Sequence, residues 1–596
     1  MNRRFAHTFH IPVMGIGFTI DTPVKVAQYG ISSVISLVDD LLMEKMREFH
    51  SLKLNIPFEA ISNKTEDSRA KRITAYLNLI DKIVREKFEE LKNSALEKGS
   101  ELKKHLEMLP AYSKLIQEYN KIVQGSDRVK KIQNWLKENL SIGSIDVNIM
   151  TKLDKTNYNG KNEELPAEYN DAHAALRGFA LSDLESSIVF SAGMHPRLYG
   201  YIENFDDFYP DEKGFIKKKI ILKVSDYRSA IIQGKFLAKK GLWISEYRIE
   251  SGLNCGGHTF ASDGYLLGPI LEEFKKNRET LIQTTHEILV QALKNKNRPY
   301  TETPLKIKIT TQGGIGTAEE HQFLIDYYKV DGVGWATPFL VVPEVTNVDN
   351  NTIDLLCKAK EEDLYLSDIS PMGIPFNSVK GNTKDIKKQQ LIEKGKPGSS
   401  CPKKLLTFNS EFTNKPICTA SFRYQNLKRK ELETKNLSPD EFNKKYDEIV
   451  DKSCICVGLG TSALLANGLD TKVEGKGVSV CPGPNMAYFS KKVSLKNMVD
   501  HIYGKINILD SKNRPNMFIK EIAMYIDYLK NKINKTQKPF TDKQIKYFDT
   551  FKNNLMNGIE YYRELTSNIR IKYRNIKADI TKELQRIEEK LSNIDM

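Results

Sequence analysis

Eight short apolar segments that alternate with helical stretches are the feature that most limits how this chain can fold. Apolar helical sequence separates most of these segments, for example at 230–238 and 281–293. Strands that alternate with helices form parallel sheets whose faces the helices cover. We therefore predict an α/β fold, a (β/α)8 TIM barrel, with an open doubly wound sheet as the alternative. The predicted strands are 11–15, 33–37, 147–150, 187–190, 219–224, 242–245, 305–310 and 332–335.

The barrel pattern is interrupted once and stops well before the end of the chain. Residues 41–140 form long amphipathic segments with Glu and Lys at helical spacing, which predicts a helical insertion after the second strand. The barrel then comprises 1–40 and 141–345. Residues 346–495 contain Cys, Gly and Pro and are irregular, and Lys-rich helices return over 496–596 as an α-rich C-terminal extension.

Composition bounds the cellular setting and the partners. The 596 residues contain no apolar run of about 18 residues and no signal-peptide pattern, so we expect a cytoplasmic protein without a membrane span. The net charge is +14, and residues 501–596 alone hold 19 Lys and Arg against 12 Asp and Glu. Such a basic region indicates either a solvated helical surface or an RNA-binding one.

Two glycine-containing turns follow the last two predicted strands. Gly313, Gly314 and Gly316 come directly before a predicted helix start at Ala318, and Gly334 precedes Thr337 after the next strand. Glycine lets the backbone approach an anion closely, and a helix start offers unpaired N–H groups. A single glycine turn is more often structural. Two such turns at consecutive strand ends predict a phosphate site, because barrels of this kind bind phosphate there.

A third turn, Glu250-Ser251-Gly252-Leu253-Asn254-Cys255-Gly256-Gly257-His258, follows the sixth predicted strand. With it, the chain resembles the nitronate monooxygenase family, the FMN barrels related to 2-nitropropane dioxygenase. Members carry Glu-Ala-Gly-Gly-His, Gly-Gly-Ile and Gly-Thr-x-Phe turns after strands six, seven and eight, and a Thr-Pro helix start after the first strand. The resemblance covers about residues 8–345 without the insertion, and it implies a flavin-binding barrel.

The resemblance also implies roles for individual residues. The FMN phosphate would be held by the glycines of the seventh turn, with Gly334 and Thr337 completing the site. Lys223, at the end of the fifth strand, would neutralise the flavin near N1 or a phosphate, unless it is simply solvated. His258 matches the family's catalytic base. The residues implied to contact FMN are Met14, Gly15, Lys223, Gly257, Gly313, Gly314, Gly316, Gly334 and Thr337.

The sixth turn departs from the family pattern. Asn254-Cys255 replaces Glu-Ala, so an acidic contact is absent and a thiol is expected beside the flavin. Cys255 could donate a proton to a reduced substrate, which would suit a reductase better than a monooxygenase. The alternative is that Cys255 is a small buried residue in place of Ala.

Five cysteines cluster late in the chain, outside the part that resembles the family. Cys-Pro steps in irregular, glycine-containing sequence suit an iron–sulfur cluster, and four thiolates would also suit zinc. Separate buried thiols are the alternative. The candidate metal ligands are Cys401, Cys418, Cys454, Cys456 and Cys481.

Together these patterns predict an FMN-dependent oxidoreductase that acts on a small or medium-sized organic substrate. A cluster at the late cysteines could pass electrons to the flavin, which would make an electron-donor protein a partner. The alternative is an RNA-associated or RNA-modifying flavoprotein that binds through its basic helices. A third hypothesis is an interaction scaffold whose added helices dock a partner.

Overall fold

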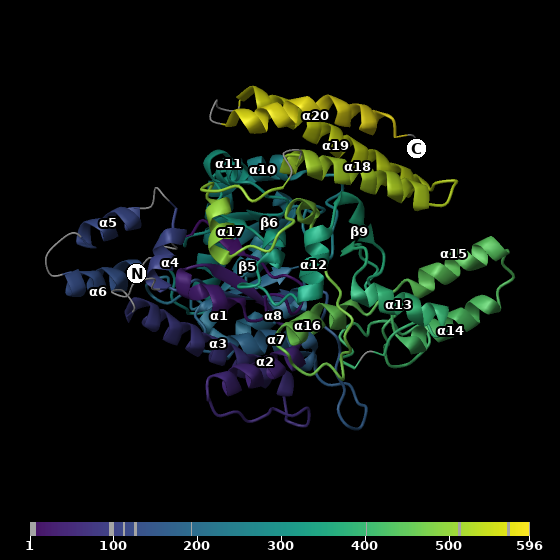
Figure 1. Ribbon diagram of the computed structural model, residues 1–596, viewed down its shortest axis with the longest axis horizontal. Helices are drawn as coiled ribbons and strands as arrows, with labels where there is room; N and C mark the ends of the chain where they lie inside the picture. Colours follow the sequence, from purple (N-terminus) through teal and green to yellow (C-terminus); the bar gives the residue numbers. More distant parts are fainter. Residues whose placement is uncertain are drawn as a thin grey trace.

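A closed barrel of eight parallel strands forms the centre of the computed structural model (Figure 1), which describes residues 7–93, 101–110, 114–123, 128–191, 193–400, 402–510, 514–568 and 573–594. Each strand pairs with the next in the sequence, and Phe9 beside Val333 closes the barrel. The predicted (β/α)8 barrel is therefore confirmed. The strands are β1 Phe9–Ile11, β2 Ser32–Ser36, β3 Ile145–Met150, β4 Ser186–Ser191, β5 Lys218–Val224, β6 Ile244–Glu250, β7 Lys308–Gln312 and β8 Gly332–Gly334.

Polar residues inside the barrel explain why one strand differs from its prediction. β6 extends to Glu250, five residues beyond the predicted end, through buried Glu246 and Arg248. These two side chains form an ion pair at 2.7 Å, and the Thr310 hydroxyl donates to Glu246 at 2.6 Å. Because each charge has a partner, β6 can carry charged residues into the core, where a purely apolar pattern was expected.

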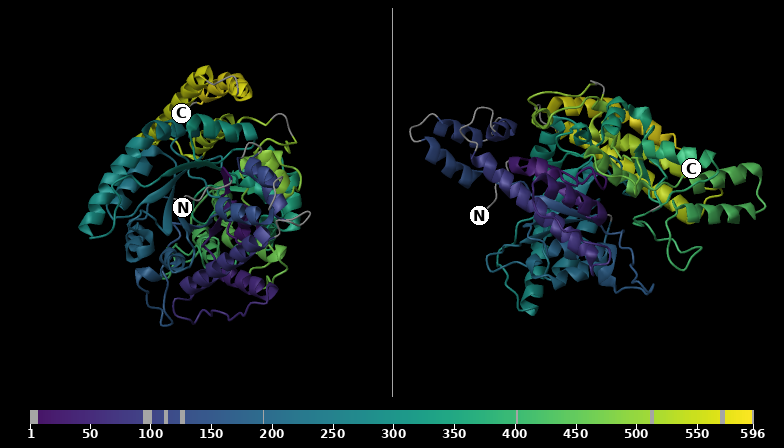
Figure 2. Two further views of the ribbon diagram at one scale, coloured as in Figure 1. Left: turned by 90° about the vertical axis from the view of Figure 1, so that its left-hand side faces the viewer. Right: turned by 60° about the horizontal axis from the view of Figure 1, so that its bottom comes forward.

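Helices cover the outside of the barrel. Seven strands are each followed by a helix: α1 Thr22–Val26, α2 Asp40–Lys53, α7 Asp171–Ala180, α8 Pro196–Tyr201, α9 Tyr227–Ala238, α10 Leu267–Asn295 and α11 Ala318–Tyr328. The predicted insertion contributes α3 Ser68–Asn93, α4 Glu101–Met108, α5 Lys114–Val123 and α6 Arg128–Asn139. Of these, α3 packs on α2 and α7 through a buried apolar face, whereas α5 and α6 project from the barrel (Figures 1 and 2).

The region after the barrel is more regular than predicted. Residues 346–495 contain α12 Asn350–Lys358, α13 Thr383–Glu393, α14 Phe422–Glu433, α15 Pro439–Val450, α16 Ile455–Ala466 and the antiparallel hairpin of β9 Leu364–Ser367 and β10 Phe376–Val379. The glycines of this region that fall within α16 do not form loops. They allow other parts of the chain to pack closely against the helix. A Cβ at Gly458 would lie 2.3 Å from Ser479 Oγ, and the Gly17 N–H after β1 donates to the Leu459 carbonyl at 3.0 Å. The buried helix α16 therefore packs on the loop that follows β1.

The remaining helices lie along one side of the barrel. α17 Leu495–Ile502 precedes α18 Met517–Lys535, α19 Asp542–Asn568 and α20 Arg574–Ser592, of which the last three lie along α10 and α11 (Figures 1 and 2). Short 3-10 helices occur at Ala27–Tyr29, Ala167–Tyr169, Ile202–Asn204, Asp206–Phe208, Thr337–Val341, Glu361–Asp363 and Pro484–Tyr488.

No single helix within the described ranges is long and apolar enough to cross a membrane. The pair α15 and α16 meets that length and composition only when taken together, with a bend of 43° at the break between them.

Lys218 is an isolated buried cation at the start of β5. Its side chain is fully buried, donates to the Ser182 carbonyl at 2.8 Å and lies over the Phe179 ring. Burial lowers its pKa to about 7. Because the unfolded chain keeps a lysine pKa near 10.4, unfolding takes up a proton between about pH 7 and 10, and stability rises with pH across this window.

Replacing this cation by an apolar side chain is expected to stabilise the protein. We expect Lys218→Met to raise the free energy of unfolding by about 2 kcal/mol at pH 7, with the gain shrinking towards pH 10. Thermal denaturation at both pH values measures this, and the exposed Lys213→Met is the control. A lower stability of Lys218→Met at pH 7 would show that the two hydrogen bonds to Ser182 outweigh the desolvation of the ammonium.

Candidate active site

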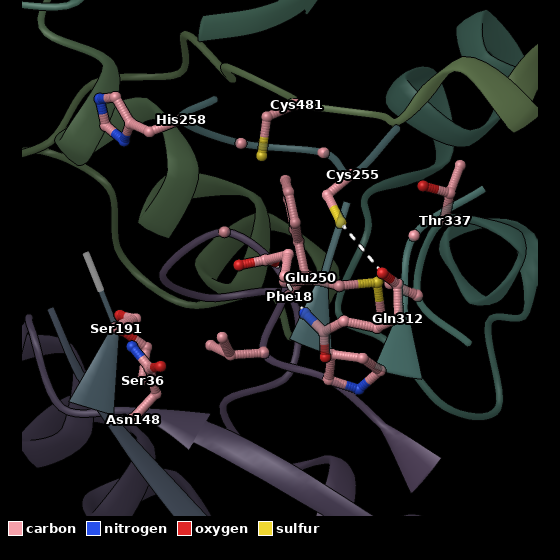
Figure 3. Close-up of a pocket in the computed structure, with 18 of the residues that line it drawn as sticks. Phe18, Ser36, Asn148, Ser191, Glu250, Cys255, His258, Gln312, Thr337 and Cys481 are labelled. Atoms are coloured by element: carbon pink, nitrogen blue, oxygen red, sulfur yellow. Dashed lines mark hydrogen bonds between the residues drawn. The ribbon is translucent and has the colours of Figure 1, made fainter. Parts of the chain in front are cut away.

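A cavity of about 210 Å³ lies at the C-terminal ends of the barrel strands (Figure 3). Residues from the ends of all eight strands and from the region after the barrel line it. This is the end of a (β/α)8 barrel at which active sites form. The predicted residues that line the cavity are Met14, Gly15, Lys223, Cys255, Gly257, His258, Gly313, Gly314, Gly334 and Thr337, together with Cys456 and Cys481 from the late cysteine group.

The turn after β7 needs glycine at two positions. Gly313 and Gly314 have φ values of +111° and +80°, which side chains rarely adopt. A Cβ at Gly313 would lie 2.6 Å from Cys255 Sγ, and one at Gly314 would lie 1.9 Å from Asn254 Nδ2. The turn after β7 is thus packed directly on the turn after β6.

Gly316 does not line the cavity, although it was predicted to hold a phosphate. Its N–H donates to the buried Glu320 carboxylate at 2.9 Å. Arg514 pairs with the same carboxylate at 2.8 Å and fills the space that a Gly316 side chain would need. An acidic side chain and an arginine from the C-terminal region therefore occupy the start of α11, and the phosphate role predicted for Gly316 is not supported by this geometry.

The turn after β8 lies beside the same cavity. Gly334 lines it, and a Cβ there would come within 2.7 Å of Gln312 Cβ, so β8 approaches β7 closely. Thr337 Oγ1 accepts a hydrogen bond from the Gly483 N–H at 3.0 Å, which leaves the hydroxyl proton to donate elsewhere. The turn thus contacts the segment that follows the late cysteines.

Lys223 is neither solvated nor isolated. Its ammonium forms an ion pair with Glu250 at 2.7 Å, and the Glu250 carboxylate also accepts from Gln312 Nε2 at 2.8 Å. These residues come from the ends of β5, β6 and β7. The cation predicted at this position is present, but a carboxylate that the sequence analysis left without a role neutralises part of its charge.

His258 lines the cavity at the end of the β6 turn. Its Nε2 hydrogen-bonds with Ser370 Oγ at 2.7 Å, and its ring meets the Phe376 ring edge-on. Burial, together with the positive charge of Lys152, lowers the pKa of His258 to about 4. The imidazole is neutral at pH 7 and free to accept a proton, although it is a weaker base than an ordinary histidine.

Cys255 is held against the backbone of β7. Its thiol donates to the Gln312 carbonyl over 3.7 Å. Burial and the nearby charge of Glu250 raise its pKa well above the usual range. The sulfur is therefore a protonated, packed thiol, and its proton points to a carbonyl rather than to the open cavity.

Three of the late cysteines do not form a metal site within the described part of the chain. Among the described residues, no group of three or more His, Cys, Asp or Glu is arranged to hold a metal ion. Cys401 lies outside the described residues, and Cys418, Cys454 and Cys456 are buried. An iron–sulfur or zinc centre at these cysteines stays a prediction.

Cys481, the last cysteine of the predicted metal set, lies in the segment after α16. It lines the barrel cavity, where burial raises the pKa of its thiol and the backbone N–H groups of Gly15 and Gly257 partly oppose that rise. It lies there because residues 479–485 cross the mouth of the barrel, a position that cysteine spacing alone cannot reveal.

Several polar residues of the cavity were missed. Asn148 is buried in the middle of β3, and its Oδ1 has no hydrogen-bond partner among the residues described. It lies with Ser36 and Ser191 on one side of the cavity (Figure 3). The only available signal was a polar residue inside the predicted strand 147–150, which is otherwise apolar. Glu250, Gln312 and Asn485 also line the cavity.

The residues present fit FMN. Asn148 and Asn254 line the cavity, and the amide oxygen of each has no hydrogen-bond partner among the described residues, so each could accept from the N–H of a flavin ring. The recorded hydrogen bonds of the β7 turn use the carbonyls of Gly314 and Ile315 and the N–H of Gly316. Within the described residues, the N–H groups of Gly313 and Gly314 take no part in them, so they could serve an anion.

Comparisons with known proteins add little beyond the fold. No protein-family model matches the chain, and no curated protein matches it. Among solved structures, the chain is similar to an IMP dehydrogenase/GMP reductase-like protein from Corynebacterium glutamicum, with 10% identity and a TM-score of 0.22. The match covers 57% of this chain and 65% of that one, just under two thirds of its length. Likeness at this level does not define an activity, so the function is inferred from the residues of the cavity.

Proposed function

We propose that the protein is an FMN-dependent oxidoreductase that acts on a small or medium-sized organic substrate at the mouth of the barrel. One observation carries this proposal: the turns after β6, β7 and β8 converge on a single cavity that also holds a neutral histidine and an ion pair. Glycine also lets a ligand approach the backbone closely, and barrels of this class bind phosphate at the turns after the seventh and eighth strands.

Each part of the cavity suits one part of FMN. The N–H groups of Gly313 and Gly314 and the hydroxyl of Thr337 would hold the phosphate. Asn148 would accept from the polar edge of the flavin ring, and Lys223 would stabilise negative charge on it. The loop of Met14 and Gly15 would cover one face, because it lines the cavity beneath α16.

The chain's own groups would then manage protons. FMN, when bound, supplies two-electron transfer to or from the substrate. His258 Nδ1 would take a proton from a carbon acid in the cavity, with the Nε2–H donating to Ser370 Oγ and so orienting the ring. The apolar side chains of Phe18, Phe376 and Leu459 would exclude water from the reacting atoms.

FMN binding is the direct test. We expect the purified protein to release FMN on denaturation, or the apoprotein to bind added FMN with quenching of its fluorescence. We expect Gly314→Ala to weaken FMN binding at least about tenfold, because its Cβ would displace Asn254 and the φ of +80° is strained. Gly160→Ala, in an open loop with no neighbour within 4 Å, is the control. Protein that neither contains nor binds FMN would refute the proposal.

The predicted metal centre and the predicted RNA binding are each tested by a separate experiment. Iron, sulfide and zinc analysis of anaerobically purified protein tests the metal centre, which would be excluded if metal-free protein were fully folded. RNA binding by the basic C-terminal helices would show as an affinity that falls steeply with salt.

A further inference from the structure

Cys481 lies in a segment that crosses the mouth of the barrel. Its carbonyl oxygen comes within 2.4 Å of the position that a Cβ at Gly256 would take, so the segment packs directly on the β6 turn. The thiol lines the cavity, and in the view of Figure 3 the sulfur lies between His258 and Cys255. The segment thereby brings a third reactive side chain to the site that the barrel alone does not supply.

Two backbone N–H groups act on this sulfur. Those of Gly15 and Gly257, in turns with φ values of +55° and +81°, favour the thiolate and so oppose the rise in pKa that burial causes. A thiol is a weak acceptor and needs no such donors, whereas a thiolate is stabilised by them. Burial nevertheless raises the pKa of Cys481 to about 12, so the sulfur holds its proton at neutral pH.

An independent observation indicates that a ligand occupies this cavity. Asn148 lines the cavity and is only 5% exposed, and its Oδ1 has no hydrogen-bond partner among the described residues. A buried amide oxygen costs free energy unless a donor meets it, so a ligand N–H or O–H is expected there. Cys481 thus faces a space that is built to hold a polar molecule.

We propose that Cys481 is the acid of this site: its thiol delivers a proton to the substrate, and the N–H groups of Gly15 and Gly257 stabilise the thiolate that remains. This inference rests on the proposed flavin function. It moves the role of proton donor from Cys255, whose proton is directed at the Gln312 carbonyl.

The step balances for the reduction of an electron-poor C=C bond. The substrate accepts a hydride from reduced flavin at one carbon, and the neighbouring carbon gains electron density. The S–H bond of Cys481 breaks, its proton forms the second C–H bond, and the electron pair stays on sulfur. Water then returns a proton to the thiolate. The substrate gains two electrons and two hydrogens, and the flavin is oxidised by two electrons.

The stereochemistry of protonation tests this role. FMN-loaded protein is reduced with dithionite and mixed with 2-methylcyclohex-2-enone, and flavin reoxidation and product chirality are measured. We expect Cys481→Ala and Cys481→Ser to slow reoxidation about 100-fold and to remove the enantiomeric excess of the product, because water protonates both faces. Binding of FMN should stay within about twofold. Cys357→Ser, on α12 outside the cavity, should match the wild type.

A second measurement needs no turnover. Alkylation of Cys481 by iodoacetamide is followed by peptide mass spectrometry across pH, with and without FMN. We expect it to begin only above about pH 10 and to be slowed by FMN, since the thiolate reacts and the thiol does not.

The outcomes separate the two proposals. If wild-type protein binds no FMN, the flavin function fails. If FMN binds but Cys481→Ala keeps the wild-type rate and enantiomeric excess, only the role of Cys481 fails. If the probe is not reduced, the alkylation profile decides: a midpoint below about pH 8 would overturn the role, because the sulfur would then rest as a thiolate.

Discussion

Replacing His258 with Ala is expected to lower turnover about a thousandfold while FMN stays bound. The imidazole ends the β6 turn, and Ser370 and Phe376 fix its orientation. A positioned base typically contributes a factor of about 10² to 10⁴. Anaerobic reduction of the bound flavin by nitroethane, a simple carbon acid, measures the step directly. His286→Gln, on α10 outside the cavity, is the control.

The pH dependence of the same reaction identifies the base. Because the pKa of His258 is lowered to about 4, the imidazole is already unprotonated at pH 5, and the rate per bound flavin should be flat from pH 5 to 8. The rate should fall only as the pH drops towards 4. An acid limb centred near 6.5 would mean that His258 is more exposed in the working enzyme than the cavity indicates.

Local sequence patterns were sufficient to predict the barrel, but not to predict how the rest of the chain packs on it. Alternation of apolar segments predicted a strand at or beside each of the eight, because a strand buried on both faces leaves a short apolar run. The first strand is an exception in position, since it was predicted at 11–15 and is Phe9–Ile11, with only Ile11 in common. The error at β6 arose where Glu246 and Arg248 neutralise each other inside the barrel. Such pairing depends on neighbouring strands, so a strand's own sequence does not indicate it.

In the candidate site, too, some residues could be predicted from the sequence and others could not. Three features come at strand ends: the turns at Gly313 and Gly334 and the ammonium of Lys223. Their position at the cavity could therefore be predicted from the order of the strands along the chain. Arg514 could not, because it reaches Glu320 from 194 residues further along the chain. Cys481 was placed by cysteine spacing in a metal set, whereas its position depends on how residues 479–485 pack on Gly256.

Truncating Arg514 to Ala is expected to destabilise the protein by about 3 to 5 kcal/mol and to weaken FMN binding. The guanidinium pairs with Glu320 at 2.8 Å, donates to the Gly314 carbonyl at 2.6 Å and to Asn485 Oδ1 at 3.0 Å. Both charged side chains are at most 5% exposed, so the mutation leaves a buried carboxylate without its partner. The β7 turn also loses a donor at the point where FMN would bind. Urea denaturation and FMN titration measure the two effects.

A double-mutant cycle separates two contributions to the loss of stability: the lost attraction between Arg514 and Glu320, and the cost of leaving the Glu320 carboxylate buried without a partner. Glu320→Gln in the Arg514→Ala background should recover part of the stability, because it removes the unpaired buried charge and its single amide oxygen can still accept from one of the two N–H groups, that of Gly316 or that of Met517. Arg563→Ala, which breaks a largely exposed pair with Glu560, should change little. If Arg514→Ala were no worse than Arg563→Ala, the C-terminal region would not hold the β7 turn. The barrel alone would then have to shape the phosphate side of the cavity.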